Sequence, residues 1–171
     1  MISIDNLKKR LDGNGQLLVQ HERGDLFLTR FEFEMGASHE EIQSCEQAIG
    51  CTLPEDYHKF LTIYNGAELF IEVTYNLSSL QINSTEKLVE YVREYQNKQN
   101  NLHTAYPSHW LLFASYHGFG EYLFLDMKNA NTIIVLGDGW KRTLDLSFSQ
   151  FLERIIITNG AAFWHWGNIL E

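Results

Sequence analysis

The stretch SHEEIQSCEQAIGCTLPEDYHKFLTIYNG, residues 38–66, predicts two short helices joined by a bend. Ser38 is followed three residues later by Glu41, a capping-box pattern in which each side chain satisfies a backbone donor where a helix begins. Apolar residues then recur at helical spacing until Gly50, which suits the left-handed conformation that often ends a helix. The first helix is therefore expected over residues 38–49.

The second half of this stretch predicts a helix over residues 54–64. Pro54 is typical of the first helical position and places the residue before it in an extended conformation. Asn65-Gly66 could form a hairpin turn, but it follows a helical period, so we interpret it as a helix C-cap. From these two helices and a later one we expect four side chains in the core: Leu53, Tyr57, Phe60 and Phe151.

The rest of the chain predicts strands that are grouped apart from helices. Alternating apolar residues or turn signals indicate strands at residues 16–21, 25–35, 68–77, 109–116, 121–126 and 132–136. Helical spacing indicates a first helix that Ser3 can cap, one near residues 84–96, and one near residues 147–158 that begins with the capping box of Ser147 and Gln150. Without βαβ alternation, this order predicts one α+β domain over residues 1–171, with helices packed against a mostly antiparallel sheet.

Composition indicates an ordinary globular protein. The chain has 171 residues, of which 44% are hydrophobic and 20% are charged, enough for one core without disulfide bridges. The first residues lack the apolar segment of a signal peptide, and no apolar run is long enough for a membrane span. We therefore expect a cytoplasmic protein whose two cysteines, Cys45 and Cys51, are reduced. The aromatic tail, with Phe163, Trp164 and Trp166, should pack back on the domain or meet another chain.

Acidic residues are concentrated in one part of the sequence. The net charge is −9, and residues 32–72 contain nine acidic residues against one base, Lys59, a net of −8. Such a surface disfavours nucleic acid and would attract a basic protein partner, although solvated helix faces would give the same pattern. The candidate contact residues are Glu32, Glu34, Glu40, Glu41, Glu55, Asp56, Glu68, Glu72 and Trp140.

No catalytic or metal-binding pattern assembles in the sequence. The seven histidines are scattered, without a pair at helical ligand spacing or a cysteine beside one. Asp126, Asn129 and Asn131 are better explained as a turn than as a calcium loop. Glu46 could be a perturbed carboxylate in an apolar helix or the acceptor of a structural hydrogen bond. We expect no enzyme activity, no metal and no cofactor.

Several of these residues together resemble the SUKH superfamily, a group of immunity proteins that includes fungal cell-wall synthesis regulators. The resemblance covers roughly residues 37–157, including the glycine turn and strand at residues 117–126 and the helix that begins at Ser147. The family-motif residues, for which the resemblance implies structural roles, are Ile42, Glu46, Ile49, Leu53, Pro54, Tyr57, Phe60, Asn65, Gly66, Gly120 and Asp126.

The resemblance implies a non-enzymatic immunity protein that occludes the active site of a cognate toxin, commonly a nuclease. A nuclease presents a basic substrate groove, which a carboxylate-rich surface would complement. The alternative that the resemblance also allows is a regulatory scaffold of the cell-wall-regulator type, which binds several signalling partners.

Overall fold

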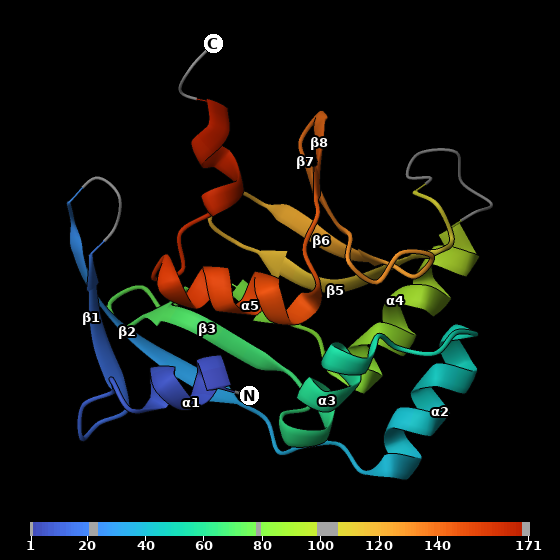
Figure 1. Cartoon of the computed structure of the whole chain (residues 1–171), viewed down its shortest axis with the longest axis horizontal. Coiled ribbons are helices and arrows are strands. Elements are labelled where there is room, and N and C mark those ends of the chain that lie inside the picture. Colours follow the sequence, from blue (N-terminus) through green and yellow to red (C-terminus); the bar gives the residue numbers. More distant parts are fainter. Residues whose placement is uncertain (1, 21–23, 78–79, 99–105, 169–171) are drawn as a thin grey trace.

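A computed structural model describes residues 2–20, 24–77, 80–98 and 106–168 of the chain. Its centre is one antiparallel sheet in which each strand pairs with its neighbours in sequence, in the order β1 to β8 (Figure 1). The strands are β1 (Gln16–Gln20), β2 (Leu26–Phe33), β3 (Ala67–Glu72), β4 (Leu80–Ile82), β5 (Trp110–Tyr116), β6 (Glu121–Asp126), β7 (Ile133–Gly137) and β8 (Trp140–Leu144). The α+β class with a mostly antiparallel sheet is confirmed.

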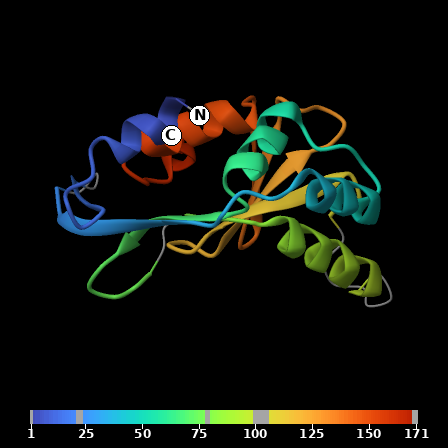
Figure 2. The same ribbon diagram turned by 90° about the horizontal axis from the view of Figure 1, so that it is seen from below.

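The helices lie on both faces of this sheet. They are α1 (Ile2–Lys8), α2 (His39–Ile49), α3 (Glu55–Ile63), α4 (Thr85–Lys98) and α5 (Phe148–Ile157), followed by the short 3-10 helix η1 (Phe163–Asn168). Figure 2 shows α1, α3 and α5 on one face, which we name the inner face, and α4 on the opposite, outer face. The helix α2 packs beside α3 and α4.

Aromatic rings fill the space between the inner face and its helices. Tyr57 of α3 and Phe148 of α5 have ring centres 4.7 Å apart, and Phe113 of β5 meets Phe148 edge-on at 5.7 Å. The four side chains expected in the core are all buried there: Leu53, Tyr57, Phe60 and Phe151. The outer face carries a smaller buried cluster of Leu112, Phe124 and Ile134. Most of the apolar burial that stabilises the fold therefore lies on the inner face.

The predicted caps form as expected. At α2 the Ser38 backbone N–H donates to Glu41 Oε2 at 2.7 Å, and the Ser147 N–H donates to Gln150 Oε1 at 3.0 Å at α5. Gly50 ends α2 at a φ of 77°, in the left-handed region that a side chain disfavours. Both capping boxes are confirmed.

Three details of the predicted helix ends are wrong. Pro54 is the N-cap of α3, so the helix begins one residue later than expected. The C-cap of α3 is Tyr64, which is extended, and Asn65-Gly66 lies beyond the helix. Ser3 lies within α1 and therefore does not precede it as a cap. Helix-end signals fix a boundary to within a residue or two because neighbouring residues can take the same role.

The strand predicted over residues 68–77 is present but too long, because β3 ends at Glu72. The chain leaves β3 after Glu72 and turns back, with the Asn76 N–H donating to the Glu72 carbonyl at 2.8 Å and Asn76 at a φ of 56°. Asparagine tolerates this left-handed conformation better than most residues. The returning segment bridges back at Leu77 and forms β4, a strand that the sequence analysis did not predict.

The last strand was also not predicted. The turn at Gly137-Asp138-Gly139 is a hairpin that joins β7 to β8, with Gly137 opposite Trp140 in the ladder. The tail beyond α5 packs on the same chain, because Trp164 is buried and its ring lies 5.1 Å from that of Tyr116. Packing in cis is thus the outcome for Trp164, whereas Trp166 is exposed.

Candidate functional site

Glu46, considered as a possible catalytic carboxylate, holds the bend between α2 and α3. Its Oε1 accepts a hydrogen bond from the Leu53 backbone N–H at 2.8 Å. The bend residue Leu53 is buried, so its N–H needs a protein partner. This contact gives Glu46 a structural role.

Other family-motif residues converge on the segment where α4 begins. The buried Tyr57 hydroxyl donates to the Asn83 carbonyl at 2.9 Å. Asn65 accepts from the Thr85 backbone N–H at 2.9 Å and donates to the Glu86 carboxylate at 3.2 Å. These contacts connect the end of α3 to the first turn of α4.

Gly66 and two later motif residues also have structural roles. Gly66 has a φ of 110°, and a β-carbon there would lie 3.2 Å from the Ile82 carbonyl oxygen. Gly120 is left-handed in the turn before β6, and Asp126 accepts from the Lys128 N–H at 2.9 Å in the turn after it. These contacts give the motif residues structural roles in the fold.

The structure divides the candidate acidic residues among three places. Glu40 and Glu41 lie in the first turn of α2, and Glu55 and Asp56 lie in the first turn of α3. The other four lie on or just after β2 and β3: Glu32, Glu34, Glu68 and Glu72. Glu41 is committed to the capping box, and Asp56 accepts the Ser149 N–H at 2.8 Å. These eight carboxylates do not form one continuous patch.

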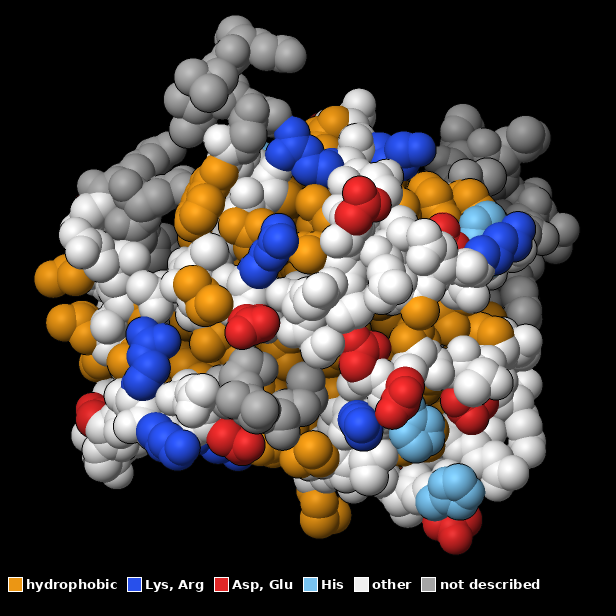
Figure 3. Space-filling model, in the orientation of Figure 1, with side chains coloured by type: hydrophobic (Ala, Val, Ile, Leu, Met, Phe, Trp, Pro, Cys, Tyr) orange, Lys and Arg blue, Asp and Glu red, His pale blue; other side chains and the backbone are white. Residues whose placement is uncertain are grey.

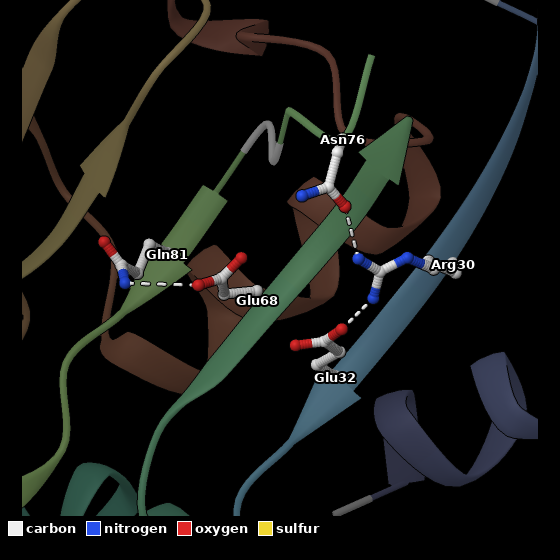
Figure 4. A network of polar contacts seen from close by, with 5 residues as sticks. All are labelled: Arg30, Glu32, Glu68, Asn76 and Gln81. Carbon is white, nitrogen blue, oxygen red and sulfur yellow. Dashed lines mark hydrogen bonds and ion pairs between the residues drawn. The ribbon is translucent and has the colours of Figure 1, made fainter. Parts of the chain in front are cut away.

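Two of the carboxylates on β2 and β3 face each other across the ladder of the sheet. Glu32 lies directly opposite Glu68, an arrangement that is destabilising unless other groups offset the repulsion. Figure 4 shows the groups that offset this repulsion: Arg30 contacts both Glu32 and Asn76, and Gln81 donates a hydrogen bond to Glu68 at 3.3 Å. In this polar network Arg30 neutralises one of the two carboxylates, and the neutral Gln81 hydrogen-bonds to the other.

A groove between α2 and α4 gathers acidic side chains from both helices. It has a volume of about 610 Å³, and the residues that line it include five glutamates: Glu40, Glu41, Glu86, Glu90 and Glu94. Arg93 is the only Lys or Arg among the described residues that line it. Three of the glutamates, Glu86, Glu90 and Glu94, belong to α4, and the sequence analysis missed them because it counted charge only over residues 32–72. Their spacing of four residues could have indicated an acidic face, since it places them on one side of a helix.

Two groups in the groove have shifted pKa values. Partial burial acts to raise the pKa of Glu86, but hydrogen bonds from its own backbone N–H and from Ser84, Thr85 and Asn65 outweigh it, so the pKa is lowered. Burial raises the pKa of the Cys45 thiol to about 12, and the Glu46 carboxylate adds to the rise. Glu86 is therefore charged and Cys45 is neutral near neutral pH, so the thiol is a poor nucleophile.

Trp140 lies away from the groove. Its ring is 5.2 Å from that of His165 in η1, and it covers Gly137, where a β-carbon would lie 2.2 Å from Trp140 Nε1. Trp140 is therefore part of the packing around the tail.

Figure 3 views the side of α1, α3 and α5, where acidic and basic side chains are interspersed.

The described residues contain no group of three or more His, Cys, Asp or Glu side chains placed to hold a metal ion. Among the helices of the described ranges, none is both long and apolar enough to cross a membrane.

Comparisons with known proteins identify the family. The chain is 31% identical over 170 residues to the uncharacterized protein YobM of Bacillus subtilis strain 168, covering 96% of this chain and 90% of that protein. It is 29% identical over 143 residues to the uncharacterized protein YnaB of the same strain, covering 78% and 86%. The sequence model of the SMI1 / KNR4 family (SUKH-1) matches residues 36–154. The chain therefore belongs to the SMI1 / KNR4 family of the SUKH superfamily.

Proposed function

We propose that this protein is a non-enzymatic immunity protein that binds and neutralises a cognate toxin domain in the cytoplasm. Membership in the SUKH superfamily supports an immunity-type role at the level of the family, which is not a known enzyme family. The toxin domain would be basic, and a nuclease is the class expected, because its substrate groove must attract phosphate.

The observation that carries the proposal is the groove between α2 and α4. Five glutamates from two helices line it against Arg93, and Lys87 forms an ion pair with one of them, Glu90, at 2.7 Å. The acidic side chains therefore remain in excess, which favours a basic partner. A basic domain would be drawn to this groove before contact, which raises the association rate more than it slows dissociation.

The test is a stopped-flow measurement of association with the purified toxin domain at several salt concentrations. Raising the salt from about 0.1 M to about 1 M shortens the Debye length from about 10 Å to about 3 Å, so association should slow strongly. Glu40→Lys combined with Glu90→Lys should slow association at low salt and abolish most of this salt dependence. Both residues line the groove, and Glu40 takes no part in the capping box of α2. The exposed ion pair of Glu90 with Lys87 is lost in the variant, which should affect folding stability little.

The matched control reverses the same amount of charge elsewhere. Asp145→Lys combined with Glu153→Lys changes two exposed residues, one just before α5 and one within it, that do not line the groove. These control reversals should affect association only weakly. If both pairs of reversals slow association equally, the net charge of the protein and not the groove attracts the partner. If the association rate changes neither with salt nor with either pair, the proposed role of charge is wrong.

A further inference from the structure

A second cavity, of about 540 Å³, lies on the outer face of the sheet between α4 and the strands β6 and β7. Three tyrosines line it: Tyr91 from α4, Tyr106, and Tyr122 from β6. The ring of Tyr106 lies 4.6 Å from that of Phe124, which is buried and also lines the cavity. Tyr122 is half-exposed, at 52% of its surface. The cavity therefore has aromatic walls that remain accessible from outside.

The charged side chains that line this cavity are both acidic. They are Glu94 from α4 and Asp138 from the turn between β7 and β8, and the described lining residues include no Lys, Arg or His. The face of an aromatic ring is also a region of negative potential. An anion would be repelled here, and an apolar group would displace water from the carboxylates without replacing its hydrogen bonds. The chemistry of the cavity fits a cation.

A cation already lies over a ring on the same face of the sheet. The Lys141 ammonium is 5.7 Å from the centre of the Trp110 ring, and that ring is 6.0 Å from the ring of Phe124. Lys141 lies opposite Leu136, which lines the cavity, although Lys141 itself does not. Lys141 thus lies beside the cavity and not in its lining, and its single positive charge offsets only part of the charge of Glu94 and Asp138.

The cavity also adjoins the acidic groove, because Glu94 lines both. We propose that it receives an arginine side chain of the toxin domain, with the guanidinium group against the tyrosine rings and near Asp138. The identity of the partner rests on the function proposed above. Arginine fits better than lysine, since its planar group stacks on aromatic rings and can donate two parallel hydrogen bonds to a carboxylate.

The first experiment tests the site without the toxin. Methylguanidinium chloride is titrated into the protein, and chemical shifts of the backbone and tyrosine rings are followed by NMR against a sodium chloride titration of equal ionic strength. We expect saturable shifts around Tyr91, Gly120, Tyr122 and Gly137. Neutral methylurea, which has nearly the same shape, should give none, because the attraction depends on the positive charge.

Variants localise the effect. Tyr122→Leu removes one ring and Asp138→Asn removes one charge, and each should raise the Kd for methylguanidinium about three- to tenfold. The matched controls are Tyr75→Leu and Asp145→Asn, an exposed tyrosine and an exposed aspartate that do not line the cavity. Equal shifts with methylurea, or equal losses in the control variants, would overturn the site.

The second experiment uses the toxin domain and separates the two proposals. Tyr122→Leu should speed dissociation about three- to tenfold while leaving the salt-dependent association rate unchanged. If the unaltered protein does not bind any toxin domain, the proposed function fails, whatever methylguanidinium does. If it binds and inhibits but Tyr122→Leu changes neither rate, the arginine site fails and the proposed function stands.

Discussion

The two faces of the sheet use the same kinds of residue for different purposes. On the inner face, Phe113, Phe148 and Phe151 are fully buried, and the Phe113 ring lies 5.7 Å from that of Phe148 and 5.6 Å from that of Phe151. On the outer face, Phe124 is buried but Tyr122, two residues earlier on the same strand, is half-exposed. Aromatic residues on the inner face therefore stabilise the fold, whereas some on the outer face are available to bind.

Carboxylates differ between the faces in the same way. Glu121, on the inner face, is 1% exposed, and its Oε2 accepts a hydrogen bond from the Trp164 indole N–H at 2.7 Å. Its other oxygen, Oε1, is hydrogen-bonded to the His165 Nε2 at 2.6 Å. Glu68, on the outer face, is half-exposed and bonded to Gln81. Burial requires that every polar atom on the inner face has a partner, while water can satisfy the outer face.

The largest expected effect comes from leucines on the two faces. Leu123→Ala should cost about 4 kcal/mol of unfolding free energy, because Leu123 is fully buried in the inner core. Leu112→Ala, on the outer face, should cost about 2 kcal/mol, because Leu112 belongs to the smaller cluster, is itself 8% exposed and lines a cavity. Denaturant unfolding measures both, and equal costs would remove the distinction between the faces.

The next prediction compares the two glutamates. Glu121→Ala should cost about 2 to 3 kcal/mol, because it leaves the buried Trp164 N–H without its acceptor. Glu68→Ala should change stability by less than about 0.5 kcal/mol, as is usual for exposed sites. Urea unfolding followed by the fluorescence of the four tryptophans measures both costs. A Glu68→Ala cost as large as that of Glu121→Ala would mean that the outer network is structurally essential.

A smaller effect is expected at the connection between α3 and α4. Asn65→Ala removes the acceptor for the Thr85 N–H and the donor to Glu86, and should cost about 1 to 2 kcal/mol, the usual range for a lost helix cap. Asn14→Ala changes an exposed asparagine in the turn before β1, and as a surface control it should change stability by less than about 0.5 kcal/mol. If the family motif is architectural, the folded Asn65→Ala protein should still inhibit the toxin; full loss of inhibition in a folded variant would contradict that view.

The elements that the sequence predicted correctly carry strong local signals. Ser38 with Glu41 and Ser147 with Gln150 mark helix starts through side chains three residues apart. The strands β5 to β7 are apolar and separated by glycine or asparagine turns, so their order needs no distant information. Both signals act over a few residues, which is the range that a single sequence can report.

The features that were missed depend on distant contacts. The strand β8 is short, half-polar and at the edge of the sheet, so only its pairing with β7 distinguishes it from a loop. The acidic groove joins helices separated by the whole of α3, β3 and β4, and no count along the chain brings Glu40 beside Glu90. The aromatic cavity is likewise assembled from α4, β6 and the turn after β7.

The smallest effect should be a pH dependence at the start of α4, the helix that covers part of the outer face. Because the folded pKa of Glu86 is lower than its ordinary value of 4.5, its contribution to stability is present above that value and is lost as the pH falls through the folded pKa. Glu86 is exposed, so water screens its interactions and the effect should be modest. Urea midpoints measured from about pH 6 down to about pH 3 should fall less steeply in Glu86→Gln than in the unaltered protein. Glu153→Gln, on the exposed side of α5, is the matched control, and should leave the slope unchanged. If Glu86→Gln also leaves the slope unchanged, the bonds from Asn65 and Thr85 do not favour the charged carboxylate, and the start of α4 is held by its packing and by the hydrogen bonds that do not involve Glu86.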